Sequence, residues 1–216
     1  RYPRDEAGDM AKLGGAGAHL VFAPAVAEMY PEGASTWVEV AGLSQGLCAD
    51  SRPHHFRGVA TVVTKLLNQA QADLALFGEK DYQQLLVIKR LARDLAIPTR
   101  VVGGPTVREP DGLAMSSRNL NLTPEHRRIA PSLHVILAES AVTLALGGPA
   151  APVLDAAALR LREAGFGPVD YVDLRDAETL ASLAAMADRP GRLLAAAWLG
   201  AVRLIDNVPV ASPCQA

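Results

Sequence analysis

The sequence predicts an α/β protein that carries a smaller α+β domain at its carboxyl end. Three observations predict this fold: short apolar runs that end at Gly or Pro, amphipathic helical patterns between those runs, and a change after residue 105 to helices followed by strands. We place the domain boundary after residue 106. Residues 1–106 then form the α/β domain and residues 107–216 form the α+β domain.

Three short apolar runs in the first half predict strands. They cover residues 20–22, 73–77 and 99–102, and Gly or Pro follows each of them closely. Apolar runs of this length, without alternation, are typical of strands that are buried on both faces of a parallel sheet. We therefore expect three buried parallel strands in the first domain.

Two helical patterns lie beside these strands. Residues 56–71 and residues 81–96 both place their apolar side chains at a spacing of 3.6 residues, which gives each helix one apolar face. The second pattern lies between two predicted strands. A strand, a helix and a strand at this spacing form a βαβ unit, so the first half should contain a parallel sheet.

The second half begins with a strong helix start. Thr123 is a good N-cap, and Pro124 suits the first helical position. We expect this helix to run to about Leu146 and a second helix to cover residues 151–164. Three strands should follow, at residues 170–174, 192–199 and 202–205, with a tight connection at Gly200-Ala201 between the last two.

Composition excludes several classes of protein. The chain has 216 residues, a formal net charge of −2 and a pI near 6.2, so it lacks the basic face expected of a nucleic-acid-binding protein. No apolar run approaches the roughly 18 residues of a membrane span. Cys48 and Cys214 are far apart and have no Cys or His companions, which argues against structural zinc and fits a reducing cytosol. The chain starts at Arg1 without Met, and we expect it to be part of a longer protein.

The first candidate site follows the strand at residues 73–77. Gly78 lets the backbone turn and lets a ligand approach, and the helix start beyond it offers free N–H groups together with the positive charge of Lys80. These features suit a phosphate group. Asp81 either caps the helix or helps to hold a metal ion, and Gln83 or Gln84 can bind a hydroxyl or a carboxylate. Taken alone, the pattern also fits a plain cap and a solvated Lys.

The second candidate site lies in the loop before Thr123. Ser116 and Ser117 stand beside Arg118, and two hydroxyls with a guanidinium can donate several hydrogen bonds to phosphate oxygens. A polar turn is the alternative for this loop. Arg52 precedes the helix at residues 56–71 and can reach an anion at its start. The adjacent His54 and His55 point in different directions, so they are poor metal ligands.

Taken together, these segments resemble pantothenate synthetases. The first match is Phe77-Gly78-Glu79-Lys80-Asp81-Tyr82-Gln83-Gln84. The second is Thr106-Val107-Arg108-Glu109 with Asp111-Gly112-Leu113-Ala114-Met115-Ser116-Ser117-Arg118-Asn119. Supporting matches occur at residues 1–4, Met29-Tyr30-Pro31, Arg52-Pro53, His55-Phe56, Gly58-Val59 and Asp206-Asn207. Each match is weak alone, but in this order and spacing the set is specific to the family.

The resemblance implies a fold and a reaction. The fold is a Rossmann-like nucleotidyltransferase sheet, of which this chain holds part, with a smaller C-terminal domain, in a cytoplasmic homodimer. The reaction is an AMP-forming ligation. The carboxylate of (R)-pantoate attacks the α-phosphate of ATP with Mg²⁺, pyrophosphate leaves, and β-alanine then attacks the pantoyl adenylate to give pantothenate and AMP.

The resemblance also implies roles for single residues. Gly78, Glu79, Lys80 and Asp81 line the ATP site, with Lys80 on the phosphates and Asp81 near the metal or the ribose. Gln84 binds pantoate, and Val107 contacts the adenine through its backbone. Met115, Ser116, Ser117 and Arg118 close over the triphosphate, and Lys80, Ser116, Ser117 and Arg118 stabilise charge as pyrophosphate leaves.

The chain departs from the family pattern in several places. The His-x-Gly-His and Asn-Pro-x-Gln-Phe segments of the family do not occur in these 216 residues, so we expect a fragment or one partner of a split enzyme, with little activity alone. Cys48-Ala49 stands where members have Glu-Gly, which leaves the role of Cys48 open, and Asn121 replaces a Tyr. Two alternatives remain: a non-catalytic nucleotide-binding module, and a cytidylyltransferase-like enzyme that acts on another substrate.

Overall fold

The computed structural model describes residues 5–186 and 188–212, and the chain divides into two compact units between Trp37 and Val38. The smaller unit contains helices α1 (Glu6–Gly15) and α2 (Val26–Met29). Asp5 caps α1, because its carboxylate accepts a hydrogen bond of 3.0 Å from the Gly8 amide. Residues 1–4, which carry one of the supporting family matches, lie outside the described residues, as does Cys214.

The strand predicted at residues 20–22 is absent, and that prediction was wrong. The segment is irregular, and Leu20 is 84% exposed. A strand forms only where a neighbouring strand pairs its N–H and C=O groups, and no described residue pairs with this segment.

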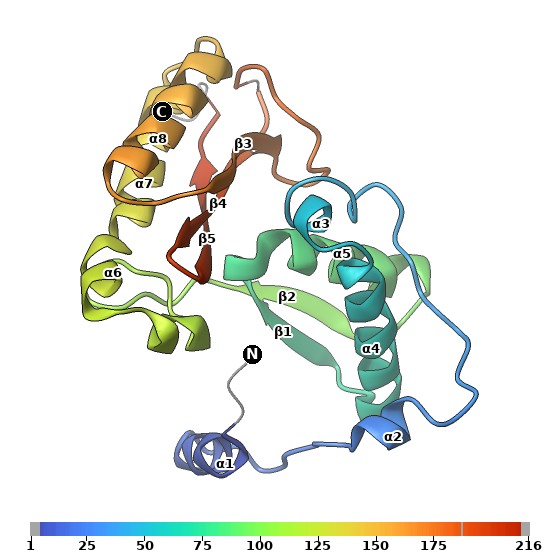
Figure 1. Ribbon diagram of the computed structural model, residues 1–216. Coiled ribbons are helices and arrows are strands. Elements are labelled where there is room, and N and C mark those ends of the chain that lie inside the picture. Colours follow the sequence, from blue (N-terminus) through green and yellow to red (C-terminus); the bar gives the residue numbers. More distant parts are fainter. Residues whose placement is uncertain (1–4, 187, 213–216) are drawn as a thin grey trace. The chain divides into compact units, whose positions relative to one another are not determined.

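The first half of the larger unit contains a parallel pair of strands, β1 (Leu74–Gly78) and β2 (Arg100–Gly104), in which Leu74 lies opposite Arg100. Helix α4 (His55–Ala70) precedes β1, and α5 (Tyr82–Asp94) connects β1 to β2 (Figure 1). The predicted βαβ unit is therefore confirmed. A short helix, α3 (Cys48–Ser51), and a 3₁₀ turn, η1 (Glu79–Asp81), lie at the starts of α4 and α5.

The parallel pair is covered on one face, so the prediction of strands buried on both faces was wrong. Ala75 and Phe77 pack on the hydrophobic core that α4 and α5 share, whereas Leu76, which points the other way, is 69% exposed. Successive side chains of a strand point to opposite faces, and among the described residues the helices of this unit cover only one of them.

An antiparallel sheet forms the second half of this unit. Its strands are β3 (Val169–Asp176), β4 (Gly191–Leu199) and β5 (Val202–Val210), with β4 in the centre. A tight turn at Gly200, where φ is +55°, joins β4 to β5, as the sequence predicted. All three predicted strands are confirmed, although β5 continues five residues further than expected.

The helices that cover this sheet are α6 (Pro124–Ile129), α7 (Ser132–Ala145) and α8 (Ala150–Glu163), and a 3₁₀ turn, η2 (Ser117–Asn121), precedes them. Thr123 caps α6 as predicted, by accepting a hydrogen bond from the His126 amide. The single helix expected from Thr123 to Leu146 was wrong, because Pro131 has no N–H to donate and its ring clashes with the preceding turn. The helix therefore ends at Ile129, and a separate helix, α7, begins at Ser132.

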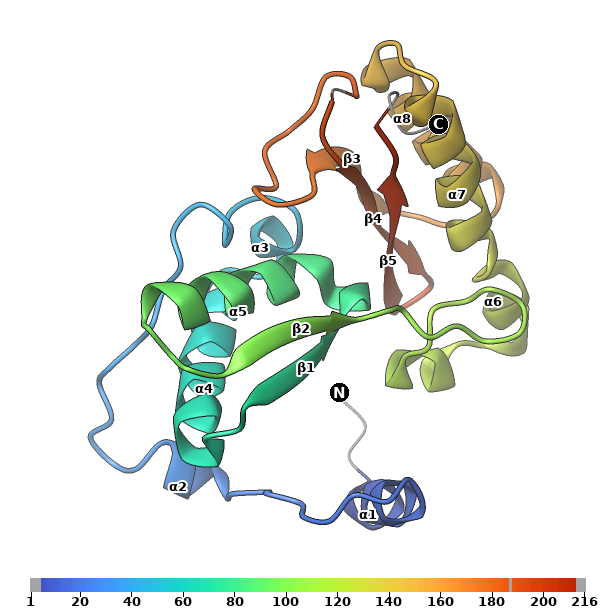
Figure 2. The same ribbon diagram turned by 180° about the vertical axis from the view of Figure 1, so that it is seen from behind.

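Both faces of the antiparallel sheet are covered. Leu193, Ala195 and Ala197 of β4 belong to the core beneath α7 and α8, whereas Leu194 belongs to the core of α4 and α5. Figure 2 shows α7 and α8 beside the antiparallel sheet, seen from behind. This double burial explains why β4 is apolar without alternation. The architecture of a parallel α/β sheet with a smaller antiparallel α+β part confirms the predicted fold class, while the boundary after residue 106 stays a prediction. No helix in the described ranges has the length and apolarity that a membrane crossing requires.

Candidate active site

The two candidate segments extend from well-ordered elements. We call residues 78–81 the Lys80 segment and residues 115–118 the Arg118 segment. The Lys80 segment follows β1 directly and forms η1, at the edge of the sheet where both parallel strands end. Open α/β sheets bind ligands at this edge. The Arg118 segment follows a turn after β2 and leads into η2.

A cavity of about 370 Å³, which includes space open to solvent, lies beside the Lys80 segment. It brings together four residues that the sequence singled out: Arg52, Lys80, Asp81 and Gln84. The other side chains that line it come from α3, α4, α5 and the antiparallel sheet: Cys48, His55, Phe56, Tyr82, Gln83, Tyr171, Leu194, Ile205, Asp206 and Asn207. The remaining predicted residues do not line this cavity: Gly78, Glu79, Val107, Met115, Ser116, Ser117 and Arg118.

The cavity is lined by two cationic side chains, Arg52 and Lys80, and by two carboxylates, Asp81 and Asp206. The Lys80 ammonium lies 3.7 Å from the Asp81 carboxylate, and their side chains are 21% and 48% exposed. Burial is the main cause that lowers the pKa of His55, and the nearby charges of Arg52 and Arg118 lower this pKa further, against an opposing effect of Asp81. The electrostatic effect of Arg118 therefore reaches His55, although Arg118 does not line the cavity. His55 is neutral near pH 7 and adds no charge of its own.

Arg52 has an unused donor. Its Nε is buried and has no hydrogen-bond partner among the described residues. Buried guanidinium donors are costly to leave unpaired, and this one belongs to a side chain that lines the cavity. The positive charge of this side chain favours an anion in the cavity.

The two glutamines of α5 have different roles. Gln83 is 4% exposed, its Nε2 donates to the Leu43 carbonyl at 3.0 Å, and its Oε1 accepts from the Cys48 amide at 3.2 Å. This side chain fastens the loop before α3, so its function is structural. Gln84 is half-buried in the cavity wall, and it remains the candidate for binding a hydroxyl or a carboxylate.

Asp81 occupies the N-cap position of α5, but its side chain makes no capping hydrogen bond. The capping role that the sequence allowed for Asp81 is therefore not realised. Gly78 also differs from expectation. Its φ of −67° is available to any residue, so the turn at this position does not depend on the conformational freedom of Gly. A Cβ at Gly78 would meet no atom within 4 Å, which leaves open space at the end of β1.

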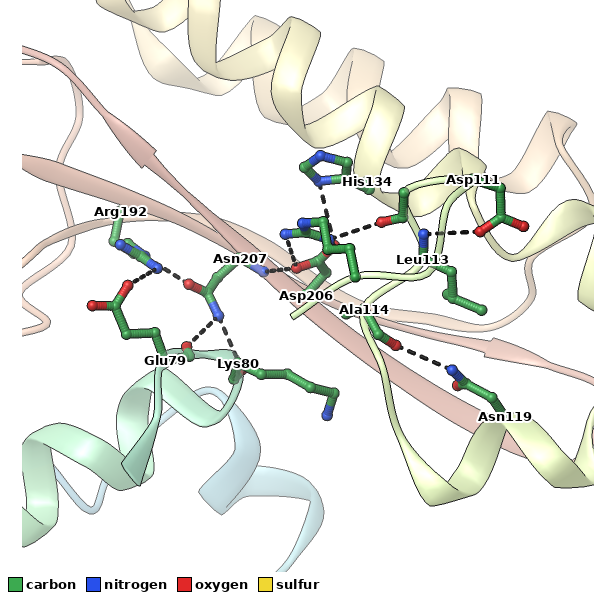
Figure 3. Close-up of polar contacts among 12 residues, drawn as sticks. Glu79, Lys80, Asp111, Leu113, Ala114, Asn119, His134, Arg192, Asp206 and Asn207 are labelled. Carbon is green, nitrogen blue, oxygen red and sulfur yellow. Dashed lines mark hydrogen bonds and ion pairs between the residues drawn. The ribbon is translucent and has the colours of Figure 1, made fainter. Parts of the chain in front are cut away.

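Glu79 is directed away from the cavity. Its carboxylate accepts a hydrogen bond of 3.2 Å from Arg192, and the Arg192 guanidinium lies 4.1 Å from the centre of the Tyr82 ring. Gly103 makes this arrangement possible, because a Cβ there would come within 3.0 Å of the Glu79 carboxylate. Arg192 also donates to Asn207 at 2.6 Å, which ties η1 to β4 and β5 (Figure 3).

A small hairpin precedes the Arg118 segment. The Met115 amide donates to the Val107 carbonyl at 3.0 Å, and the Glu109 amide donates to the Leu113 carbonyl at 2.8 Å. Val107 and Met115 are 67% and 50% exposed, so their side chains are free to meet a ligand. Within the segment, Ser116 caps η2 by accepting from the Arg118 amide at 3.3 Å.

Arg108 fastens this hairpin to β5. Its guanidinium makes a two-pronged ion pair with the buried carboxylate of Asp206, at 2.7 and 2.9 Å. The His134 Nδ1 lies 3.5 Å from the same carboxylate; burial is the first cause that lowers the pKa of His134, and the charge of Arg108 is the second.

Cys48 belongs to a polar cluster beside the cavity. Its thiol lies 3.1 Å from the Tyr171 hydroxyl and 3.7 Å from a guanidinium nitrogen of Arg203. Arg203 also donates to Asp170 at 2.7 Å. Burial is the first cause that raises the pKa of the Tyr171 hydroxyl far above its ordinary value, and the neighbouring thiol is the second. Sequence reasoning missed Tyr171 and Arg203, because nothing nearby in the sequence relates them to Cys48.

Metal binding by the protein alone is not supported in the described part of the chain, where no three His, Cys, Asp or Glu side chains gather closely enough to hold an ion. Asp81 is the one acidic residue of the Lys80 segment that faces the cavity. A single carboxylate suits Mg²⁺, which is commonly held by one or two carboxylates together with substrate phosphates and water.

Comparison with known proteins identifies close relatives. The family model described as Pantoate-beta-alanine ligase matches residues 1–209. Pantothenate synthetase from Chelativorans sp. is 58% identical over 212 residues, which are 98% of this chain and 74% of that protein. Pantothenate synthetase from Paramagnetospirillum magneticum is 60% identical over 210 residues, which are 97% of this chain and 74% of that protein.

Solved structures agree with these matches. The crystal structure of pantothenate synthetase from Thermus thermophilus superposes with a TM-score of 0.89 at 48% identity, and covers 97% of this chain and 76% of the solved one. The pantoate-beta-alanine ligase from Francisella tularensis, complexed with β-γ ATP and β-alanine, superposes with a TM-score of 0.78 at 32% identity, and covers 96% and 70%. Both similarities extend over both sheets of the chain.

Proposed function

The chain belongs to the pantoate-beta-alanine ligase family, and from this premise we propose that it serves the ATP-dependent condensation of (R)-pantoate with β-alanine. The products are pantothenate, AMP and pyrophosphate. The observation that carries the proposal is the cavity at the carboxyl end of β1, where Lys80, Asp81 and Gln84 converge with Arg52. A Francisella tularensis relative crystallised with β-γ ATP and β-alanine supports the same ligands.

The reaction proceeds in two steps. A pantoate carboxylate oxygen attacks the α-phosphorus of ATP, the bond to the bridging oxygen breaks, and pyrophosphate leaves with that electron pair. The product of this step is pantoyl adenylate. The β-alanine amine then attacks its acyl carbon and loses a proton, and AMP leaves, so that an amide bond replaces the acyl–phosphate bond.

The residues of the cavity have separate roles in this scheme. Lys80 binds the triphosphate and offsets its charge as pyrophosphate departs, and the N-terminus of α5 beside it adds a positive dipole. Gln84 binds pantoate, and the Arg52 guanidinium offers its positive charge to the pantoate carboxylate or to a phosphate. Gly78 and Glu79 complete the ATP site, Gly78 by its open space and Glu79 by its backbone.

The Arg118 segment completes the nucleotide site from the other side. Val107 contacts the adenine through its backbone, and Met115 covers the nucleotide. Ser116, Ser117 and Arg118 donate to the leaving pyrophosphate, and the effect of Arg118 on the pKa of His55 supports a position near the cavity. Charge-assisted hydrogen bonds of this kind contribute about 1.5–3 kcal/mol each.

Mg²⁺ fits the site as a companion of the nucleotide. Asp81 faces the cavity with a half-exposed carboxylate that no capping hydrogen bond occupies. We propose that this carboxylate holds the ion together with phosphate oxygens. A bound Mg²⁺ would neutralise part of the triphosphate charge and so favour attack on the α-phosphorus.

Further parts of the proposal concern the whole protein. The Lys80 segment belongs to a nucleotide- and pantoate-binding domain, and the part after residue 106 forms the domain that covers it. We propose a homodimer, by the family resemblance, and a cytoplasmic location, with which the free buried thiol of Cys48 is consistent. Because these 216 residues contain no His-x-Gly-His segment, we expect them to turn over little substrate on their own.

The test combines binding with isotope exchange. Isothermal titration of the 216-residue chain with ATP and Mg²⁺, and then with pantoate, should give binding of both ligands. Exchange of labelled pyrophosphate into ATP should depend on pantoate and not on β-alanine, and should be slow for this chain. Exchange without pantoate, or no nucleotide binding at all, would refute the proposal.

The same titrations separate the two other candidate functions. A cytidylyltransferase-like enzyme would bind CTP more tightly than ATP and would not bind pantoate. A non-catalytic module would bind a nucleotide, but pantoate would neither bind nor start exchange. Nothing in the described cavity favours either function, and Gln84 beside Lys80 favours a substrate that carries a hydroxyl or a carboxylate.

A further inference from the structure

Two adjacent residues of β5, Asp206 and Asn207, reach both candidate segments. Both side chains are almost fully buried, at 3% exposure each. Adjacent residues of a strand point to opposite faces of the sheet, so they can serve two different neighbours. Figure 3 shows that Asn207 meets the Lys80 segment while Asp206 meets the hairpin that leads to the Arg118 segment.

Asn207 holds the Lys80 segment by its backbone. Its Nδ2 donates to the carbonyls of Glu79 at 3.0 Å and of Lys80 at 2.9 Å. Its Oδ1 accepts from Arg192 at 2.6 Å, and this contact fixes the orientation of the amide. All three contacts use backbone carbonyls or Arg192 and none uses the Lys80 ammonium, and Figure 3 shows the Lys80 side chain extending away from Asn207.

Asp206 holds the hairpin before the Arg118 segment. Its carboxylate accepts hydrogen bonds from both terminal nitrogens of the Arg108 guanidinium. Arg108 also donates to the Gly112 carbonyl at 3.0 Å, across the turn of the hairpin. The Asp206 Oδ1 also accepts the Asn207 amide at 2.7 Å. One dipeptide therefore connects the two segments through a short chain of buried hydrogen bonds.

We propose that Asp206 and Asn207 are positioning residues that fix the spacing between the Lys80 segment and the Arg118 segment. This inference rests on the proposed function, in which one triphosphate contacts both segments. Neither residue needs to touch the nucleotide, because Asn207 acts through the Glu79 and Lys80 carbonyls and Asp206 acts through Arg108. A ligand that spans two segments binds tightly only where their separation is fixed beforehand.

The hydrogen bonds of Asn207 support a positioning role over a purely stabilising one. Asn207 donates its two amide hydrogens to two consecutive carbonyls of the 3₁₀ turn η1, those of Glu79 and Lys80. Apolar packing alone would stabilise the fold without fixing the position or the orientation of η1. Hydrogen bonds to both carbonyls set both of these, since they are directional.

The first experiment measures amide hydrogen exchange in the 216-residue chain without a ligand. Asn207→Asp keeps the size and the acceptor toward Arg192 but removes the donor to the two carbonyls. It should speed exchange at residues 79–84 about tenfold, with a smaller change at residues 107–119. Asp206→Asn should give the reverse pattern. If Asp206→Asn does not fold, Arg108→Lys tests the same contact from the other side.

The control is Asp176→Ala. Asp176 is also 3% exposed, but its carboxylate accepts from Glu178 and Thr179 in the turn after β3 and pairs with Arg189 at 3.1 Å, and it has no hydrogen bond to either segment. This variant should lower the melting temperature without a selective change in exchange at either segment. An equal change in both segments for Asn207→Asp, or the pattern of the control, would overturn the inference.

The second experiment is a double-mutant cycle on the affinity for ATP with Mg²⁺. Asn207→Asp should weaken ATP binding about tenfold in the wild-type chain, and by less than twofold when Lys80 is already replaced by Ala. A purely structural role would give the same loss in both backgrounds, and that result would overturn the inference. A wild-type chain that binds no ATP would refute the proposed function, whereas the exchange patterns would still test the anchoring itself.

Discussion

Replacing Lys80 by Ala is the sharpest test of the cavity, because the expected changes in folding and in binding differ in size. The ion pair with Asp81 spans 3.7 Å between side chains that are 21% and 48% exposed. Exposed pairs of this kind contribute about 0–1 kcal/mol, so Lys80→Ala should reduce the free energy of unfolding by less than about 1 kcal/mol. A lost charge-assisted contact to phosphate should instead cost about 1.5–3 kcal/mol of binding, or about a 10- to 150-fold rise in the dissociation constant for ATP.

The assay is isothermal titration of ATP with Mg²⁺ into the wild-type chain and two variants, next to urea unfolding of each. Lys89→Ala is the matched control. Lys89 is exposed on α5, the helix that follows the Lys80 segment, and Lys89→Ala removes the same charge without touching the cavity. It should change the affinity for ATP by less than about twofold at an ionic strength of about 0.15 M, where charges beyond about 8 Å are largely screened.

Three outcomes would contradict the argument. An affinity for ATP that stays within twofold after Lys80→Ala would mean that the ammonium contacts no phosphate. Equal losses for Lys80→Ala and Lys89→Ala would mean that the nucleotide responds to overall charge and not to this site. A large loss of folding stability in Lys80→Ala would also contradict the prediction, which expects a small change in the free energy of unfolding and a large change in the affinity for ATP.

Three further predictions concern stability. The pKa of His134 is lowered below 6.5 in the folded chain, so its neutral form contributes stability that is present above about pH 6.5 and lost as the pH falls. His134→Gln should therefore make the fall in unfolding free energy between about pH 7 and pH 5 shallower, and an unchanged slope would refute this. Gly200 has a φ of +55°, and a Cβ there would lie 2.7 Å from the His126 ring, so Gly200→Ala should lower the unfolding free energy by about 1–3 kcal/mol in urea titration. Cys48→Ala removes the thiol partner of Tyr171 and Arg203 and should cost about 1–3 kcal/mol, whereas Cys48→Ser should retain most of the stability; equal losses would show that the polar contact is unimportant.

The elements of the chain were predictable where a local rule decides them. The apolar stripe of α4, the Thr123 cap and the Gly200 turn are each determined by a few neighbouring residues, and each is found. The predictions failed where the outcome depends on a distant partner. The apolar run at residues 20–22 resembles a strand in sequence, but a strand also needs a neighbour that pairs with it.

The candidate site was predictable only in part, for the same reason. The sequence singled out Lys80, Asp81 and Gln84 because chemistry and spacing appear together in one short segment. It could not show that Asp206 and Asn207 lie beside that segment, since more than 120 residues separate them and no periodicity relates them. The family resemblance named this pair as a match without giving it a role, and only the folded contacts supply one.

The position of these anchors also bears on how the cavity can work. The Lys80 segment follows the parallel strands, and the hairpin before the Arg118 segment is bonded to the antiparallel sheet. Both are nevertheless anchored by hydrogen bonds to the same strand, β5. The anchors fix the bases of the segments, and Val107 and Met115 are the two exposed residues of the hairpin that are expected to meet the nucleotide. Ligand binding should therefore order those two side chains and leave the Lys80 backbone in place. Faster exchange at residues 79–81 when ATP binds would contradict this.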